Sequence, residues 1–300
     1  MRKPAAIHEG DTVGLVAPSG RFDPQRLARG VEILESWGLR VRCYEGAKPV
    51  RYLAAADRIR AEWLEAAFVD PEIAAILAVR GGFGASRLHT FFDPAVAAAN
   101  PKAFVGFSDV SLLLNRLVQE AGLVCYHGPM VAADLPRLSE AARERFRRFL
   151  FGEPGWWNGQ GREVWRSGTA EGRLVGGCLS VLVTTLGTPY EIDTRGAVLF
   201  LEDVAEKPYR IDRMLSHLRH AGKFEEVAAV VFGPMLDCDG GGGTRLLREI
   251  ALEVLDGFRF PIVFGLDAGH GSDNVVLPLG CRVRVDGEAA RLELLEDPFA

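Results

Sequence analysis

Apolar positions in the first half of the chain follow two alternating spacings, one typical of strands and one typical of helices. Short apolar runs predict strands at residues 12–17, 41–44, 73–79, 103–107 and 123–126. Apolar stripes at helical spacing predict helices between these runs, such as the stripe from Leu27 to Leu34 that ends at Gly38. A second helix is expected to run to about Phe68 with Asp57 as its N-cap. Alternating strands and helices predict a parallel sheet covered on both faces, with ligands at the carboxyl ends of its strands.

The second half of the chain has more strand character. Strands are predicted at residues 170–175, 197–201, 227–232, 262–266 and 274–279, followed by a hairpin over 282–295. Asp286 and Gly287 are expected to form its two-residue turn. The segment from 152 to 161 is rich in Gly and Pro and separates the halves. We therefore expect an N-terminal parallel-sheet α/β domain over 1–152, a linker over 153–169 and a strand-rich C-terminal α/β domain over 170–300.

Composition excludes several classes of partner. The chain has 300 residues, 48% of them hydrophobic, and its net charge of −5 comes from interspersed acids and bases. No basic cluster is dense enough to follow a phosphate backbone, so no nucleic acid is expected. No apolar run approaches the ~20 residues of a membrane helix, and the N-terminus has no secretory pattern. The five cysteines are scattered, which is typical of reduced thiols in a cytoplasmic protein.

The segment from 103 to 117 carries the strongest chemical signal. An apolar strand runs into Ser108, and a helical apolar stripe follows at once. A turn at this point raises the hydroxyl above the sheet and directs free N–H groups of the helix at whatever the serine attacks. Gly106 leaves room for a sharp bend, and the helix dipole favours Asp109 at the helix start. The alternative is that Ser108 is an ordinary N-cap, a far commoner role.

A serine nucleophile needs a general base and an acid that orients it. His270 lies between two glycines in a loop after an apolar run, where its ring is free to reach outward. Glu202 and Asp203 directly follow five apolar residues, and a carboxylate at the end of a buried strand is costly unless it is paired. The alternatives are a turn histidine with its own local partners and two acids that simply end the strand in water. Serine, acid and base then occur in the order Ser108, Glu202, His270.

Other residues are candidates for supporting roles. The N–H groups of Asp109 and of Gly82, in the glycine loop 80–84, are candidates for an oxyanion hole. His127 follows a strand and could line a cleft. His217 and His220 could share a metal, although a position on the helix surface is the more ordinary interpretation because no third ligand is near. A module that binds a sugar or nucleotide through the glycine loop remains an alternative, although the loop lacks the phosphate-binding patterns.

These motifs together resemble the LD-carboxypeptidases, serine peptidases of the muramoyltetrapeptide carboxypeptidase and microcin-immunity type. The matching segments are 10–19, 80–84, 106–109, 127–129, 199–203, 208–215 and 269–271. The resemblance implies a triad of Ser108, Glu202 and His270 in a metal-independent cytoplasmic enzyme without a cofactor, often a homodimer. Its implied substrate is a small murein peptide, a tetrapeptide that loses its terminal D-alanine at an L,D-bond during cell-wall recycling. The alternative is hydrolysis of aminoacyl-nucleotide analogues, as in the microcin-immunity branch.

The resemblance also suggests where the substrate binds. Gly81 lies in the glycine loop, and His127 lies in a matching segment. A cation is expected to hold the free carboxylate of the peptide, and Arg80 and Arg210 are equal candidates. The segment 156–161 and the run Gly240–Gly243 have no counterpart in the family pattern. An aromatic platform for a nucleotide could come from Trp156 or Trp157.

Overall fold

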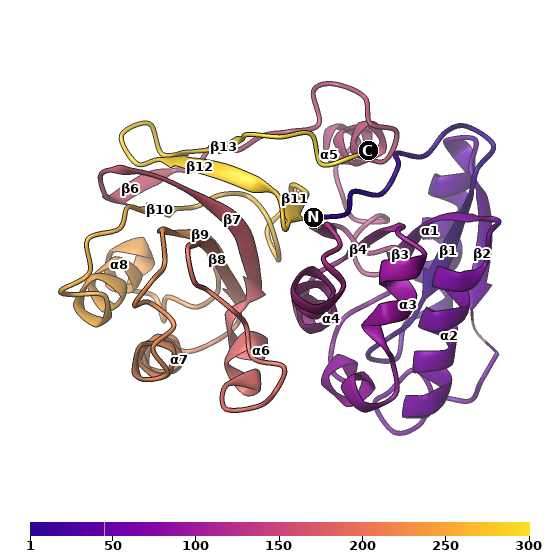
Figure 1. Cartoon of the computed structure of the whole chain (residues 1–300), viewed down its shortest axis with the longest axis horizontal. Coiled ribbons are helices and arrows are strands. Elements are labelled where there is room, and N and C mark those ends of the chain that lie inside the picture. The colour runs from indigo at the N-terminus through magenta and orange to yellow at the C-terminus, as the bar shows by residue number, and fades with distance from the viewer. Residues whose placement is uncertain (45) are drawn as a thin grey trace. The chain divides into compact units, whose positions relative to one another are not determined.

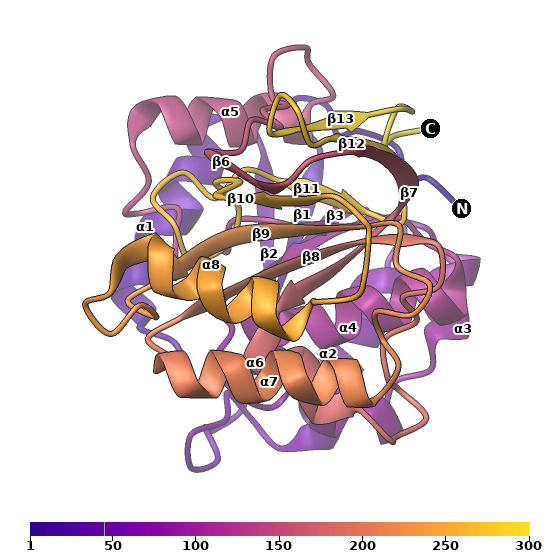
Figure 2. The same ribbon diagram turned by 90° about the vertical axis from the view of Figure 1, so that its left-hand side faces the viewer.

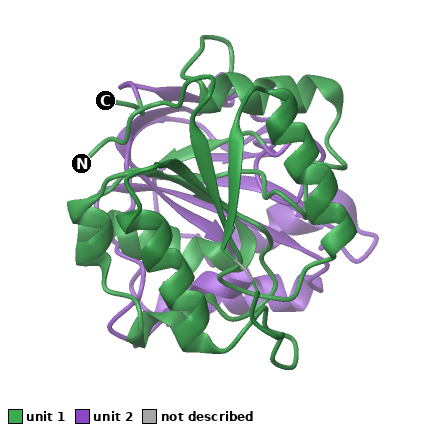
Figure 3. Ribbon diagram, turned by 90° about the vertical axis from the view of Figure 1, so that its right-hand side faces the viewer, with its two compact units in different colours: residues 1–158, 275–279, 298–300 green, residues 159–274, 280–297 purple. Residues whose placement is uncertain are grey.

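The computed structural model describes residues 1–44 and 46–300, which divide into two compact units (Figure 3). Unit 1 comprises Met1–Asn158, Val275–Leu279 and Pro298–Ala300, and unit 2 comprises Gly159–Asn274 and Gly280–Asp297. The mixed α/β class expected from the sequence is confirmed. The expected domain limits stay predictions, and the division between the units at Gly159 falls inside the expected linker.

Unit 1 is built on a sheet with the strand order β11-β5-β4-β3-β1-β2 (Figure 1). Its strands are β1 Thr12–Val16, β2 Arg40–Tyr44, β3 Ile73–Ala78, β4 Ala103–Gly106, β5 Cys125–His127 and β11 Leu277–Leu279. Its helices are α1 Pro24–Ser36, α2 Asp57–Val69, α3 Pro94–Ala99, α4 Ser111–Arg116 and α5 Glu140–Leu150, with short turns η1 Ala85–Thr90, η2 Ser108–Val110 and η3 Leu117–Ala121. Strands β1 to β5 pair in parallel, while β11 is antiparallel to β5.

The core of unit 1 follows from the apolar runs. Strand β1 is buried along its whole length, and every residue of β4 is buried. Helices lie on both sides of the sheet (Figure 3), which explains why these strands are continuously apolar instead of alternating. Helix α1 begins as the sequence requires, because Asp23 accepts a hydrogen bond from the Gln25 N–H at 2.8 Å and Pro24 occupies the first turn.

Unit 2 has a sheet with the strand order β13-β12-β7-β8-β9-β10-β6. Its strands are β6 Glu163–Arg166, β7 Thr169–Cys178, β8 Ala197–Val204, β9 Ala229–Leu236, β10 Ile262–Phe264, β12 Arg282–Asp286 and β13 Arg291–Leu294. Its helices are α6 Leu179–Leu182, α7 Pro208–His220 and α8 Gly243–Val254, with the turn η4 Val183–Thr185. Strands β7 to β10 are parallel, and β6, β12 and β13 extend them by antiparallel pairing. Helices α7 and α8 lie side by side over one face (Figure 2).

Two local expectations were wrong, and one strand lies in the segment that was expected to be a linker. The N-cap of α2 is Ala56, and Asp57 lies inside the first turn, where it pairs with Arg60 at 2.5 Å. The final hairpin turns over residues 287–290, because the Asp286 side chain accepts hydrogen bonds from the N–H groups of Glu288 and Ala289 and widens the turn. Strand β6 lies within the expected linker 153–169.

The cysteine prediction is confirmed. All five cysteines are free thiols, and all but Cys43 are buried. Burial raises the pKa of the Cys178 thiol well above its usual value, and the nearby carboxylates of Glu202 and Asp203 raise it further. These buried thiols therefore pack as small neutral groups. Within residues 1–44 and 46–300, no helix has the length and apolar character needed to cross a bilayer.

Candidate active site

Ser108 occupies a strained turn between β4 and α4. Its φ is +59°, in the left-handed region that costs a residue with a side chain about 1–2 kcal/mol. It is the first residue of η2, whose N-cap is Phe107, and no side-chain hydrogen bond caps η2 or α4. The N-cap interpretation of Ser108 is therefore wrong. Strain held at a half-buried hydroxyl beyond a strand end is characteristic of nucleophile turns.

Glycines make this turn possible and bring the glycine loop against it. A side chain at Gly106 would come within 2.8 Å of Val110 and 3.0 Å of Ala78, so the bend expected there requires glycine. A Cβ added to Gly81 would lie 3.0 Å from Ser108 Cβ and 3.1 Å from its Oγ. The same Cβ would be 3.4 Å from the Asp109 nitrogen. The backbone of the glycine loop therefore lies directly beside the hydroxyl.

The loop after β1 joins the same edge of the sheet. The Gly20 N–H donates to the Gly81 carbonyl at 2.9 Å, which links the loops after β1 and β3. Gly82, with a φ of +101°, lies next to Gly20: its added Cβ would be 3.6 Å from Gly20 Cα. The sequence prediction that these loops share the carboxyl edge of a parallel sheet with Ser108 is confirmed.

Two buried charged side chains hold these loops in place. Asp109 Oδ2 accepts a hydrogen bond from the Ala85 N–H at 2.8 Å, so the residue after Ser108 fixes the end of the glycine loop. Burial raises the pKa of Asp109. The guanidinium of Arg60, which is fully buried, donates to the carbonyls of Pro18 and of Gly84, the latter at 3.0 Å. Sequence reasoning missed Arg60, whose one available signal was its place three residues after Asp57 on an apolar helix.

In unit 2, Glu202 and His270 form a direct pair. His270 Nδ1 lies 2.7 Å from Glu202 Oε2, and the His270 backbone N–H donates to the same oxygen at 3.1 Å. The Glu202 carboxylate is fully buried, whereas the His270 side chain is 21% exposed. Because an ionised carboxylate only accepts, Nδ1 carries the proton in this pair, and in the neutral imidazole Nε2 is then an acceptor. The alternatives of a turn histidine and of acids that end the strand in water are therefore wrong for this pair.

The loop that presents His270 is shaped around the carboxylate. Gly269 has a φ of +104°, and a Cβ there would lie 2.4 Å from Glu202 Oε2, so only glycine fits. The Gly269 N–H donates at 2.8 Å to the side-chain oxygen of Asn274, a buried residue with a φ of +42°. On the opposite side, a Cβ at Gly233 would be 2.9 Å from Glu202 Cβ. Asn274 supports the loop, and sequence reasoning did not identify it.

Asp203, the other candidate acid, has a different role. Its Oδ2 accepts from the Ser180 N–H at 2.7 Å, and its Oδ1 accepts from the Val204 N–H at 2.9 Å. Burial raises the pKa of Asp203, and these N–H donors act against that rise. Asp203 thus anchors the start of α6 to β8, and Glu202 alone of the two contacts the imidazole.

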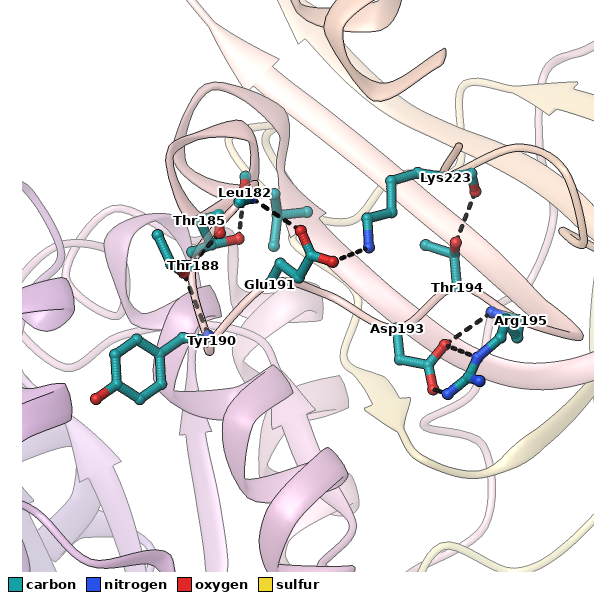
Figure 4. Close-up of polar contacts among 10 residues, drawn as sticks. Leu182, Thr185, Thr188, Tyr190, Glu191, Asp193, Thr194, Arg195 and Lys223 are labelled. Carbon is teal, nitrogen blue, oxygen red and sulfur yellow. Dashed lines mark hydrogen bonds and ion pairs between the residues drawn. The ribbon is translucent and has the colours of Figure 1, made fainter. Parts of the chain in front are cut away.

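The segment before β8 fixes the position of that strand. Thr185 and Thr188 bond to preceding carbonyls at 2.7 and 2.6 Å, and Lys223 pairs with Glu191 at 2.9 Å (Figure 4). Thr194 donates to the Lys223 carbonyl at 2.6 Å just before β8 begins. These contacts hold the strand that carries Glu202.

The remaining candidates are more dispersed. His127 is fully buried in β5, with its ring centroid 5.6 Å from that of Phe107. Arg210 is exposed on α7 and pairs with Glu206 at 3.1 Å. His217 and His220 are both exposed on α7, and no group of three potential metal ligands occurs among the described residues. Contact of Arg80, Gly81, His127 or Arg210 with a substrate stays a prediction.

Fold and sites together define a two-unit hydrolase of mixed α/β class, with a serine at a strained turn in one unit and a carboxylate–histidine pair in the other. Residues 13–128 match the LD-carboxypeptidase N-terminal domain, and residues 171–285 match the LD-carboxypeptidase C-terminal domain. The chain therefore belongs to the LD-carboxypeptidase family and is a serine peptidase, as the sequence motifs suggested.

Relatives and solved structures agree with this assignment. The chain is 37% identical to a probable murein peptide carboxypeptidase of Bacillus subtilis, over 95% of this chain and 91% of that protein. A muramoyltetrapeptide carboxypeptidase from Oxalobacter formigenes aligns with a TM-score of 0.83 and 30% identity, over 94% of this chain and 97% of that one. The microcin C7 self-immunity protein MccF of Escherichia coli is 27% identical over 97% of this chain and 95% of that protein. A structure of MccF with glutamyl sulfamoyl guanosine aligns over 99% of both chains, with a TM-score of 0.89 and 25% identity.

Proposed function

We propose that this chain is an L,D-carboxypeptidase that releases the terminal D-alanine of murein tetrapeptides through Ser108, Glu202 and His270. The observation that carries the proposal is the pairing of a buried carboxylate with His270 Nδ1, combined with a serine held at a strained turn. The names of the relatives at 30% identity and above support a murein peptide as the substrate.

In the proposed reaction His270 acts first as a general base and then as a general acid. Ser108 Oγ attacks the carbonyl carbon of the L,D-bond while His270 Nε2 takes the hydroxyl proton. Glu202 holds the ring through Nδ1 and stabilises the imidazolium. The carbonyl oxygen becomes an oxyanion and accepts hydrogen bonds from the Gly82 and Asp109 N–H groups. His270 then protonates the amine of D-alanine as the C–N bond breaks, and a water molecule deprotonated by the same histidine hydrolyses the acyl-enzyme.

The test is product analysis with murein tetrapeptide and tripeptide. We expect alanine from the tetrapeptide alone, and none from Ser108→Ala. Ser36→Ala is the matched control, because Ser36 is an exposed serine of unit 1 that bonds only within α1. Release of alanine by Ser108→Ala at the rate of the control variant would refute the nucleophile.

The second candidate is hydrolysis of aminoacyl-nucleotide analogues, because MccF aligns over nearly the whole chain. Trp156 is buried against Phe149 with ring centroids 5.2 Å apart, so Trp157, which is half-buried, is the remaining candidate for the aromatic platform. A side-by-side assay of tetrapeptide and aspartyl sulfamoyl adenosine, a compound found bound to MccF, separates the two functions. Turnover of the nucleotide analogue alone would replace the first proposal with the second.

The setting of the enzyme is part of the proposal. We infer a cytoplasmic enzyme of cell-wall recycling, supported by free buried thiols and by the family. It is expected to form a homodimer, which sedimentation of the purified chain tests. Loss of alanine release on chelation would contradict the metal-independent chemistry.

A further inference from the structure

A cavity of about 640 Å³ opens in unit 1 beside the glycine loop. Its lining residues are Gly20, Arg21, Tyr52, Arg80, Gly82 and Phe83. We call it the arginine–aromatic pocket. Its floor is continuous with the site, because Gly20 bonds to Gly81, which lies against Ser108. A ligand in this pocket therefore lies next to the proposed nucleophile.

Two guanidinium groups, those of Arg21 and Arg80, line the pocket. Arg80 Nη1 donates to the Arg21 carbonyl at 2.5 Å, and Arg21 Nη1 contacts the Arg51 carbonyl at 3.4 Å. Within the described part of the chain, neither the Arg21 nor the Arg80 guanidinium forms an ion pair with a carboxylate. Elsewhere on the surface arginines do pair, as Arg147 does with Glu153 at 2.7 Å. Guanidinium groups held in place without an acid are suited to a carboxylate that comes with a ligand.

Two large rings complete the pocket. Tyr52 is 54% exposed and Phe83 is 48% exposed, which is unusual for neighbouring aromatic side chains. Their centroids are 5.7 Å apart and their planes meet at 71°, so one ring supports the edge of the other. The exposed ring faces offer apolar contact beside the two lining arginines.

We propose that the arginine–aromatic pocket binds the acyl part of the substrate, the portion before the scissile bond. Arg21 and Arg80 would bind a free carboxylate there, with Tyr52 and Phe83 against the adjoining aliphatic chain. This rests on the proposed function. The size of the cavity favours the acyl part, because pockets of 300–1,000 Å³ hold drug-sized ligands whereas the leaving group is a single alanine.

The chemistry of the acyl part fits this assignment. In a murein stem peptide the glutamate is joined through its γ-carboxyl, which leaves its α-carboxylate free. A planar carboxylate matches the fork of a guanidinium. The pocket therefore selects an acidic peptide over the same peptide with its glutamate amidated.

The test is calorimetric binding of the tripeptide product, in its acid form and as the glutamate α-amide, to the intact protein. We expect the acid form to bind about tenfold more tightly, as for one charge-assisted hydrogen-bonded contact. Arg80→Gln and Arg21→Gln should remove that preference and leave binding of the amide within about twofold. Arg21→Gln keeps the backbone carbonyl that Arg80 contacts, so it separates lost charge from a disturbed loop.

Arg29→Gln is the matched control, because Arg29 is exposed on α1 and lies outside the pocket. Equal binding of acid and amide, or an unchanged preference in both pocket variants, overturns the proposal. If adenosine monophosphate binds more tightly than the tripeptide, and Arg80→Gln loses that tighter binding, the pocket is assigned to nucleotides. Dissociation of a dimer by Tyr52→Ala would assign it to a second copy of the chain. Failure of the proposed function is read separately, from alanine release by the wild-type protein.

Discussion

Replacing Ser108 with glycine is expected to abolish activity and to stabilise unit 1. The positive φ of +59° costs serine about 1–2 kcal/mol, a cost that glycine avoids. Glycine loses about 0.5–1 kcal/mol more backbone entropy on folding, which offsets part of the gain. We therefore expect the free energy of unfolding of Ser108→Gly to be about 1 kcal/mol higher than that of Ser108→Ala, because alanine keeps the strain of the positive φ.

Urea unfolding followed by tryptophan fluorescence measures this difference. Trp37, Trp63, Trp156 and Trp157 belong to unit 1 and Trp165 to unit 2, so the signal reports mainly on the unit that holds the turn. The expected gain corresponds to a rise of about 2–4 °C in Tm. Both variants should release no alanine.

The control uses the same substitution three residues later. Ser111 starts α4 with a φ of −51°, so Ser111→Gly should lower stability by about 0.5–1 kcal/mol, as glycine does in a helix. Equal stability of Ser108→Gly and Ser108→Ala would show that the turn stores no strain. A strained nucleophile turn at Ser108 would then be refuted.

Two further tests concern the site, and a third concerns the buried histidine His89. Glu202→Gln should lower kcat by about 10³–10⁴-fold, because it loses the carboxylate that orients His270. Asp203→Asn should lower kcat less than about tenfold. Equal losses in the two variants would contradict the different roles assigned to Glu202 and Asp203. Gly269→Ala should destabilise unit 2 and abolish turnover, because its Cβ would lie 2.4 Å from the Glu202 oxygen; a wild-type rate would disprove the close approach. Burial and Arg116 lower the pKa of His89 to about 4, so its neutral form is favoured in the fold. Unfolding free energy should fall by about 2 kcal/mol from about pH 7 to pH 5 as the unfolded state takes up the proton, a slope that His89→Gln should reduce in urea titrations.

The sequence predicted the parallel strands of unit 1 and the turn at Ser108 because these depend on local patterns. An apolar run followed directly by a helical stripe leaves one residue at the turn, and that residue is Ser108. Local sequence could not decide whether Glu202 or Asp203 pairs with His270. Neighbouring residues of a strand point to opposite faces, so the outcome depends on which face of β8 meets the His270 loop.

The features that sequence analysis missed depend on contacts beyond the local sequence pattern. The buried guanidinium of Arg60 is stable only because carbonyls from two distant loops and Asp57 surround it. Asn274 likewise supports the loop only because its side-chain oxygen meets the backbone N–H of Gly269. A propensity pattern contains neither relationship, because each needs a partner that is remote in sequence or a particular loop geometry.

The path of the chain after His270 limits how the protein can be divided. Directly after Asn274 the chain enters unit 1, adds β11 beside β5, and returns to unit 2 at Gly280. The last residues then come back to unit 1, where the Tyr126 hydroxyl donates to the Pro298 carbonyl at 2.9 Å. Neither half can therefore be produced from one uninterrupted stretch of sequence. A gene fragment ending at residue 158 would yield a sheet whose β5 edge is uncovered and open to pairing with other molecules.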